Sequence, residues 1–599
     1  MRKMSFSCKM IFLTLTLLLT AGLVACGGGD TPAETTPDTL QDTEVVPTTE
    51  ATTEEVTQTN EDTQADTALE TAPDTTPEAT TEAVTDVMIG ETLDADYAAD
   101  FLVSNVFSND MVVQRGEHIR VWGTAPASEN GKKVTGEFKG MFAEALIENG
   151  EWVLTFGARL DASTEMGHTM KIYTDKKQVK FDNVLVGDVY MVIGQSNVAY
   201  SMANHWAFNN TPDKGGQTAI DDNAPIRIHY NSLSQTTGYP QRGTKEVCTE
   251  LRNGSVWQKA TKTSIGNFTA IGYLFAYNMI DLTDNQVPVG IIEIDGNGAP
   301  LGTFMPNEVA DATGSDAYNS AKGYYETPNT SANYGASRYM YNHYMFPFEK
   351  YAIAGIVWYQ GESDYHQNNA KVFANNFTAL MTYMRGTHNL VNKTFPVYMI
   401  EFPTNYQQHP DFVASTAEPF WAAMDVGLIR SVLGSVPQIL PNSYVTTSSD
   451  LWTDDTFWNT LHPNCKFEQA QRCAKIAAAV LGIGDKAAAT GPILTSIEVS
   501  GKTAVLTFDN VGEGLKTSDG EKAVKGFGLI DKSFRVTDAG RCGLEATITA
   551  PNQITITSNR RITGIIYNFV YWNEYGEHVN LCNSYGVPAC ATLMFAEEK

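Results

Sequence analysis

The sequence predicts an α/β domain with a parallel sheet, flanked on each side by a β-sandwich domain. Residues 185–487 alternate short apolar strands with segments of helical periodicity. Residues 98–184 and 488–599 contain short strands in the two-residue period instead. Repeated β–α units build a parallel sheet with helices on both faces, whereas short strands between turn signals build sandwiches. About 500 residues also exceed what one hydrophobic core holds, so two or three domains are expected.

The first 26 residues have the features of an export signal. A basic start precedes the apolar stretch 11–19, which is too short to span a bilayer of about 30 Å. The segment ends in Leu-Val-Ala-Cys at 23–26, which resembles a bacterial lipobox. Cleavage there would leave Cys26 lipidated, and more than one acyl chain anchors a protein firmly. We therefore expect a cell-surface protein, held by lipid on the outer face of a bacterial cell membrane.

Residues 27–97 form an acidic, low-complexity segment rich in Thr and Pro. They contain 19 acidic residues and no Lys or Arg. Such a composition cannot bury enough apolar surface to fold, so a disordered tether is expected. Much of the net charge of −28 lies in this linker. No basic stripe appears elsewhere, which argues against nucleic acid as a partner.

The cysteines give no sign of a metal site. Their spacing fits no known set of zinc ligands, and we expect neither a metal nor an organic cofactor. Cys465 and Cys473 lie eight residues apart on a predicted helix, which argues against a bond between them. Cys582 and Cys590 flank a turn, and a disulfide there is left open.

The strands and helices follow from the apolar pattern. The N-terminal sandwich is expected from strands at 111–114, 118–122, 133–138, 151–156 and 169–173. The α/β domain is expected from helices at 265–282, 370–385 and 466–481 and strands at 189–193, 287–294, 354–359 and 395–400. The C-terminal sandwich is expected from strands at 493–499, 503–508, 553–557 and 564–567.

Ser196 is the first candidate for chemistry. The apolar run 189–193 ends abruptly in Gly-Gln-Ser-Asn at 194–197. Open α/β sheets bind their ligands at the carboxyl ends of the strands. A serine in such a turn is a candidate nucleophile, although all four residues also favour ordinary turns.

Three further motifs follow predicted strands or precede a helix in the same domain. The loop 295–300 contains Gly298, which lets a backbone N–H approach a ligand. Gln360 offers an amide donor for the oxyanion of an acyl-transfer intermediate. His462 stands just ahead of a predicted helix and could act as general base toward Ser196. Together these residues predict an acyl hydrolase.

The motifs resemble those of the bacterial sialate O-acetylesterases, a family of the SGNH (GDSL-like) hydrolase superfamily. The resemblance extends from about Phe101 to the end of the chain. Its blocks are Asn-Asp-Met-Val-Val-Gln at 109–114, Gly-Gln-Ser-Asn at 194–197, Trp-Tyr-Gln-Gly-Glu-Ser at 358–363, Leu-His-Pro at 461–463 with Lys466, and the segment 580–589. The resemblance implies an SGNH-type three-layer hydrolase domain at 185–487.

The resemblance also implies a double-displacement mechanism. Ser196 would attack an acetyl carbonyl, and His462 would serve as general base. The backbone N–H of Ser196, Gly298 and Gln360 would form the oxyanion hole. The implied substrate is an O-acetylated glycan, either sialic acid or a plant polysaccharide.

The triad acid stays open. Many relatives carry an Asp two or three residues before the histidine, where this chain has Asn459 and Thr460. The alternatives are Asp455, Asp450 or no carboxylate, with Glu362 as a weaker option.

The rival interpretation is a catalytically impaired glycan-binding lipoprotein. The changed glycine block, Gly-Asn-Gly at 296–298, and the missing acid motivate it. Its aromatic candidates for stacking on sugars are His205, Trp206, Tyr324 and Tyr325.

Overall fold

The computed structural model describes residues 101–597, apart from residue 166 and the segments 233–245, 252–253, 315–337, 365–366, 403–420, 452–461 and 570–577. The predicted export signal, the lipidation site Cys26 and the linker 27–97 lie outside the described residues. Within the described part of the chain, no helix combines the length and apolar character needed to cross a membrane.

A mixed sheet of mainly parallel strands forms the centre of the fold. Its strands are β9 (Leu185–Gly194), β10 (Ile226–Ser232), β11 (Trp257–Lys259), β12 (Val289–Asp295), β13 (Gly355–Tyr359), β14 (Val397–Ile400) and β15 (Ser443–Thr446). They run in the order β11-β10-β12-β9-β13-β14-β15, and only the edge strand β11 pairs antiparallel along that path. Every residue of β9, β12 and β13 is buried, as expected of strands covered on both faces.

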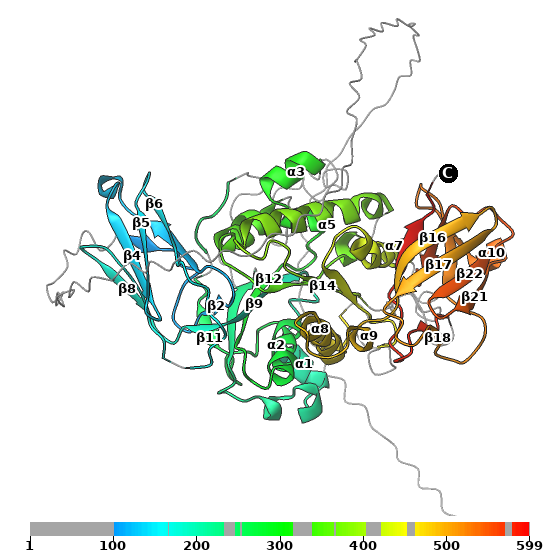
Figure 1. The fold of residues 1–599 in the computed structure, drawn as a ribbon, viewed down its shortest axis with the longest axis horizontal. Helices are drawn as coiled ribbons and strands as arrows, with labels where there is room; N and C mark the ends of the chain where they lie inside the picture. Colours follow the sequence, from blue (N-terminus) through cyan, green and yellow to red (C-terminus); the bar gives the residue numbers. More distant parts are fainter. Residues whose placement is uncertain are drawn as a thin grey trace, which may run out of the picture. The chain divides into compact units, whose positions relative to one another are not determined.

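Helices cover both faces of this sheet (Figure 1). The helices of this domain are α1 (Met202–Phe208), α2 (Ala270–Leu282), α3 (Asn307–Thr313), α5 (Gln367–Thr387), α7 (Trp421–Ser435), α8 (Lys466–Val480) and α9 (Lys486–Ala489). Helices α2 and α8 pack together on one face, and α5 and α7 pack together on the other. The α2 helix is shorter than the predicted 265–282, because the Thr269 side chain accepts a bond from the Gly272 N–H and caps the helix there.

Antiparallel strands precede the central sheet. They are β1 (Leu102–Val103), β3 (Arg120–Thr124), β4 (Lys133–Phe138), β5 (Met141–Leu146), β6 (Glu151–Thr155), β7 (Met170–Tyr173) and β8 (Gln178–Phe181). They form one sheet in the order β1-β3-β6 and another in the order β5-β4-β7-β8. Strands β1, β5 and β8 were not predicted from the sequence.

Strand β2 (Val112–Gln114) corrects one prediction. We expected residues 111–114 to belong to the N-terminal sandwich, but β2 pairs parallel with the start of β9. All three of its residues are buried, so it joins the layer that is covered on both faces. This pairing ties the chain segment after β2 to the central sheet.

A second group of antiparallel strands follows α9. It consists of β16 (Ile493–Ser500), β17 (Thr503–Asp509), β18 (Lys516–Thr517), β19 (Phe527–Ile530), β20 (Val536–Asp538), β21 (Glu545–Ala550), β22 (Gln553–Thr557), β23 (Gly564–Tyr567), β24 (Leu581–Cys582) and β25 (Thr592–Phe595), with the short helix α10 (Ala539–Cys542). Two four-stranded sheets, β16-β17-β22-β21 and β20-β19-β23-β25, enclose a separate hydrophobic core. Cys582 and Cys590 are not joined by a disulfide in this structure.

Candidate active site

The three central strands end level with one another. Asp295 at the end of β12 pairs with Gly194 at the end of β9, and Gly194 pairs with Tyr359 at the end of β13. The loops that follow carry Ser196, Gly298 and Gln360. Because β9 is also the point at which the strand order reverses, these loops meet at the topological switch of the sheet.

The turn after β9 presents Ser196. A Cβ on Gly194 would lie 2.1 Å from the Tyr359 carbonyl oxygen, so the strands approach this closely only with glycine there. The Val198 and Ala199 N–H groups both donate to the Gln195 carbonyl and close the turn. Ser196 is half-buried, whereas Gln195 and Asn197 on either side are buried.

Gln195 and Asn197, on either side of Ser196 in the sequence, form hydrogen bonds with the turn after β13. The Ser363 N–H donates to Gln195 Oε1 at 3.1 Å. Asn197 Nδ2 donates to Glu362 Oε1 at 2.5 Å. These two bonds hold the loop that carries the candidate nucleophile against the loop that follows Gln360. Neither bond was predicted, although all four residues lie in the sequence blocks 194–197 and 358–363.

Lys466 extends this network to the first residue of α8. Its Nζ donates to Asn197 Oδ1 at 2.7 Å and lies 5.1 Å and 5.0 Å from the ring centres of Tyr200 and Tyr359. Burial lowers the pKa of Lys466 to about 8. Burial also raises the pKa of Glu362 to about 7, against the opposing effect of the Asn197 bond. The side-chain amide of Asn197 therefore hydrogen-bonds two buried ionisable groups, Glu362 through Nδ2 and Lys466 through Oδ1.

His462 lies four residues before Lys466 and is half-buried. Burial, followed by the positive charge of Lys466, lowers the pKa of His462 to about 4. The imidazole is therefore neutral at neutral pH, which is the protonation state that a general base requires.

The glycine loop and Gln360 differ from each other in exposure. Gly298 is exposed with φ +68°, and a Cβ there would meet nothing within 4 Å. Gln360 is fully buried, and its Nε2 donates to the Ala299 carbonyl at 3.0 Å and to Asp364 Oδ2 at 2.6 Å. Asp364 Oδ2 also accepts from the Leu301 N–H at 2.8 Å. One amide bond of Gln360 thus holds the loop after β12 directly, and the other holds Asp364, which binds the same loop through Leu301. The role of Gln360 in an oxyanion hole stays a prediction.

The candidates for the triad acid have different positions. Both carboxylate oxygens of Asp450 accept from the Arg472 guanidinium, at 2.6 Å and 2.7 Å. Asp455 lies outside the described residues. Among the residues that the structure describes, no group of three or more His, Cys, Asp or Glu side chains could hold a metal ion.

Two of the aromatic residues proposed for sugar stacking are buried in the fold. The His205 ring hydrogen-bonds the Lys214 carbonyl at 2.8 Å, and Trp206 Nε1 donates to the Gly215 carbonyl at 3.3 Å. Both side chains therefore secure the loop after α1, which corrects their assignment to a sugar-binding surface. Tyr324 and Tyr325 lie outside the described residues.

Known proteins resemble this chain in sequence and in fold. Residues 186–432 match the family model SASA, described as carbohydrate esterase, sialic acid-specific acetylesterase. The sialate O-acetylesterases of Pongo abelii and Homo sapiens are each 22% identical to this chain over 341 residues, or 55% of this chain and 60% of the relative. The chain therefore spans less than two thirds of the length of the curated relatives that it matches.

A solved structure shares most of the architecture. The crystal structure of a carbohydrate acetylesterase from Xanthomonas citri has a TM-score of 0.60 at 20% identity, and the likeness covers 83% of this chain and 100% of that chain. This confirms the predicted fold class, an SGNH-type α/β domain with flanking β-rich regions. The matched residues 186–432 lie within the middle domain, which is therefore the part of the chain that is similar in sequence to the sialate O-acetylesterases.

Proposed function

We propose that this protein is a carbohydrate O-acetylesterase that releases acetate from O-acetylated sugars. One observation carries the proposal. The Asn197–Lys466 hydrogen bond joins the Ser196 turn to the N-terminus of α8, within a domain that matches an acetylesterase family model. His462 lies near that N-terminus with a depressed pKa. The same arrangement supports acyl transfer through a serine and a neutral histidine.

The proposed reaction has two steps. In the first, Ser196 Oγ attacks the acetyl carbonyl carbon, His462 takes the hydroxyl proton, and the sugar oxygen leaves with that proton. In the second, His462 takes a proton from water, the resulting hydroxide attacks the acyl-serine, and acetate leaves as the serine regains its proton. The backbone N–H of Ser196, Gly298 and the side-chain amide of Gln360 would stabilise the oxyanion in both steps. For Gln360 this requires that at least one amide hydrogen leave its present acceptor.

Turnover of p-nitrophenyl acetate tests the assignment. We expect Ser196→Ala to lower kcat by about 10³-fold or more, since the nucleophile is removed. Ser201→Ala is the matched control, because Ser201 lies five residues further along and only caps α1 through the Asn204 N–H. Full activity in Ser196→Ala would reject the mechanism.

The substrate class needs a second comparison. Acetate release from O-acetylated mucin and from acetylated hemicellulose would separate a sialic acid substrate from a plant polysaccharide. The engaged amide of Gln360 and the altered glycine loop favour one rival, a glycan-binding protein without catalysis. Binding of either glycan without any acetate release would support that rival.

We further propose that Cys26 carries a lipid that anchors the protein to the outer face of a bacterial cell membrane. The lipobox-like sequence at 23–26 supports this. Mass spectrometry of the N-terminal peptide tests it. A Cys26→Ala protein that stays in the membrane fraction would reject it.

A further inference from the structure

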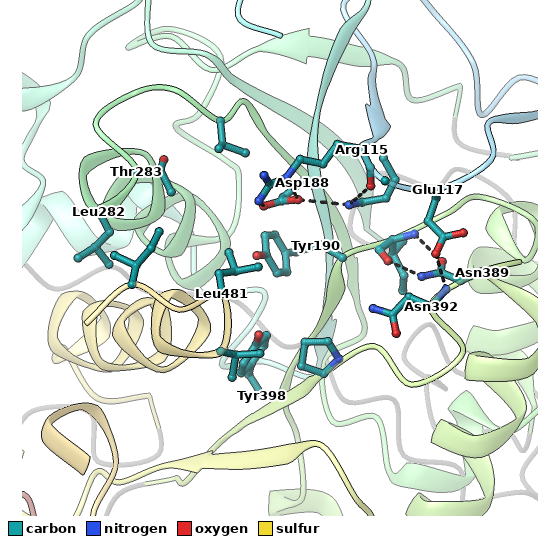
Figure 2. A pocket seen from close by; sticks show the side chains of 18 of the residues that line it. Arg115, Glu117, Asp188, Tyr190, Leu282, Thr283, Asn389, Asn392, Tyr398 and Leu481 are labelled. Atoms are coloured by element: carbon teal, nitrogen blue, oxygen red, sulfur yellow. Dashed lines mark hydrogen bonds and ion pairs between the residues drawn. The ribbon is translucent and has the colours of Figure 1, made fainter. Parts of the chain in front are cut away.

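A cavity of about 820 Å³ opens near the amino ends of the parallel strands of the central sheet (Figure 2). Residues that precede or begin β9, β13, β14 and β15 line it, together with the last turns of α2 and α8. Tyr190 lies four positions before the end of β9, or about 13 Å along the strand, and Ser196 lies in the turn beyond that end. The cavity is therefore distinct from the site proposed for ester hydrolysis.

A compensated ion pair lies in the cavity wall. Arg115 Nε and Nη2 donate to the two carboxylate oxygens of Asp188, each at 2.8 Å. Gln114 Nε2 also donates to Asp188 Oδ1 at 3.2 Å. Asp188 is buried, whereas the Arg115 side chain is 31% exposed. The pair offers a planar polar surface without an uncompensated buried charge (Figure 2).

Two buried tyrosines line the same cavity. Tyr190 and Tyr398 are each 1% exposed, and their ring centres lie 6.5 Å apart. Within the described residues, neither phenolic oxygen has a hydrogen-bond partner. Burial raises the pKa of both groups well above the usual value, so both hydroxyls stay protonated. Neither oxygen belongs to the fully buried side-chain atoms that lack a partner, so water or a ligand in the cavity can hydrogen-bond each hydroxyl.

The remaining charges argue against an anionic ligand. Glu117 accepts from the backbone N–H groups of residues 390–392 and is thereby satisfied inside the wall. Asp161 and Asp284 also line the cavity and are exposed. The carboxyl ends of α2 and α8 add partial negative charge at the cavity. Anions are thus repelled from the rim, while the interior is close to neutral.

We propose that this cavity is a second, non-catalytic site that binds a neutral sugar or a short neutral oligosaccharide. Sugar hydroxyls both donate and accept, which matches the two phenols, the Arg115–Asp188 pair and the amide of Asn392 in the lining. The volume lies within the range of about 300–1,000 Å³ that ligand pockets occupy. The site would hold a glycan at a place remote from the ester bond.

Isothermal titration and saturation-transfer NMR test the site on the full chain. The probes are glucose, galactose, mannose, xylose and xylotetraose. The analogues glucosamine and glucuronate each replace one hydroxyl-bearing group of glucose with a charged group. We expect a neutral sugar to bind, glucuronate to bind at least about tenfold more weakly because of the acidic rim, and glucosamine to bind at least as well as glucose.

Variants locate the binding. The double change Tyr190→Phe and Tyr398→Phe removes only the two hydroxyls and should weaken the binding by about tenfold. Tyr273→Phe is the matched control, since Tyr273 is a buried tyrosine of α2 outside this cavity. Turnover of p-nitrophenyl acetate should be unchanged in all three proteins, which separates this site from the proposed esterase. The proposal is overturned by the absence of neutral-sugar binding, by equal binding in the double variant, or by preferred binding of glucuronate.

Discussion

Glu362 offers a direct test of the buried network behind the Ser196 turn. Glu362 is only 8% exposed, and its carboxylate accepts a hydrogen bond from Asn197 Nδ2 at 2.5 Å. Because burial disfavours the carboxylate, the pKa of Glu362 rises from 4.5 to about 7. Glu362→Gln keeps the shape and the acceptor oxygen for Asn197 but removes the titrating proton. The variant therefore isolates the free-energy cost of the buried charge.

The sign and size of the effect follow from linkage. The folded state holds the Glu362 proton more tightly than the unfolded state does. Its stabilising contribution is fully present below pH 4.5 and is lost as the pH rises through about 7. The difference between the two pKa values corresponds to up to about 3 kcal/mol. Lys466 keeps its charge up to a pH of about 8, so Glu362 is the first of the two to titrate.

Thermal unfolding of the wild type and Glu362→Gln from about pH 4.5 to about pH 7.5 measures the effect. We expect the variant to gain several degrees in its unfolding midpoint relative to the wild type as the pH rises, about 2–4 °C per kcal/mol. Glu545→Gln is the control, since Glu545 is an exposed acid on β21. Parallel midpoints for wild type and Glu362→Gln over the whole range would refute a buried, proton-binding Glu362.

A pH profile and three substitutions probe the rest of the site. The kcat/KM for p-nitrophenyl acetate should stay level from neutral pH downward and halve near pH 4, where His462 gains its proton; an inflection near pH 6.5 would contradict the depressed pKa. Asp450→Asn should lower kcat/KM less than about tenfold, because Arg472 already holds both carboxylate oxygens; a loss of about 10³-fold or more would instead identify Asp450 as the triad acid. Gly194→Ala should lower yield and activity together, because its Cβ would collide with a β13 carbonyl, whereas Gly298→Ala should cost only about 1–2 kcal/mol in thermal stability for its left-handed backbone.

The fold was predictable where the pattern is local. The strands at 189–193 and 354–359 are continuous apolar runs, and the parallel sheet buries such runs on both faces. The segment 111–114 was misplaced because three or four apolar residues fit either kind of sheet. Its partner, the start of β9, lies about 70 residues away, and no local signal records that pairing.

The site was predictable only as far as strand ends reveal it. The rule that ligands bind at the carboxyl ends of parallel strands selects Ser196, Gly298 and Gln360. The bond between Asn197 and Lys466 joins residues 269 positions apart, so spacing could not predict it. The cavity near the amino ends of the parallel strands could not be predicted from the sequence for a related reason. Its tyrosines sit inside apolar strands, where a sequence gives them the appearance of core residues.

The network around Lys466 is better explained by position than by stability. A buried charge is costly to desolvate, and replacing buried charges with apolar groups of similar size is often neutral or stabilising. Here the ammonium contacts Asn197 and two rings, Tyr200 from the loop after β9 and Tyr359 from β13. An apolar side chain would fill the same space without a directional bond to the Ser196 turn. The bond to Asn197 fixes the first residue of α8 against the Ser196 turn, and His462 is only four residues away. For His462 as the proposed general base such placement would matter, since misplacement by about 1 Å can cost about 10²-fold in rate.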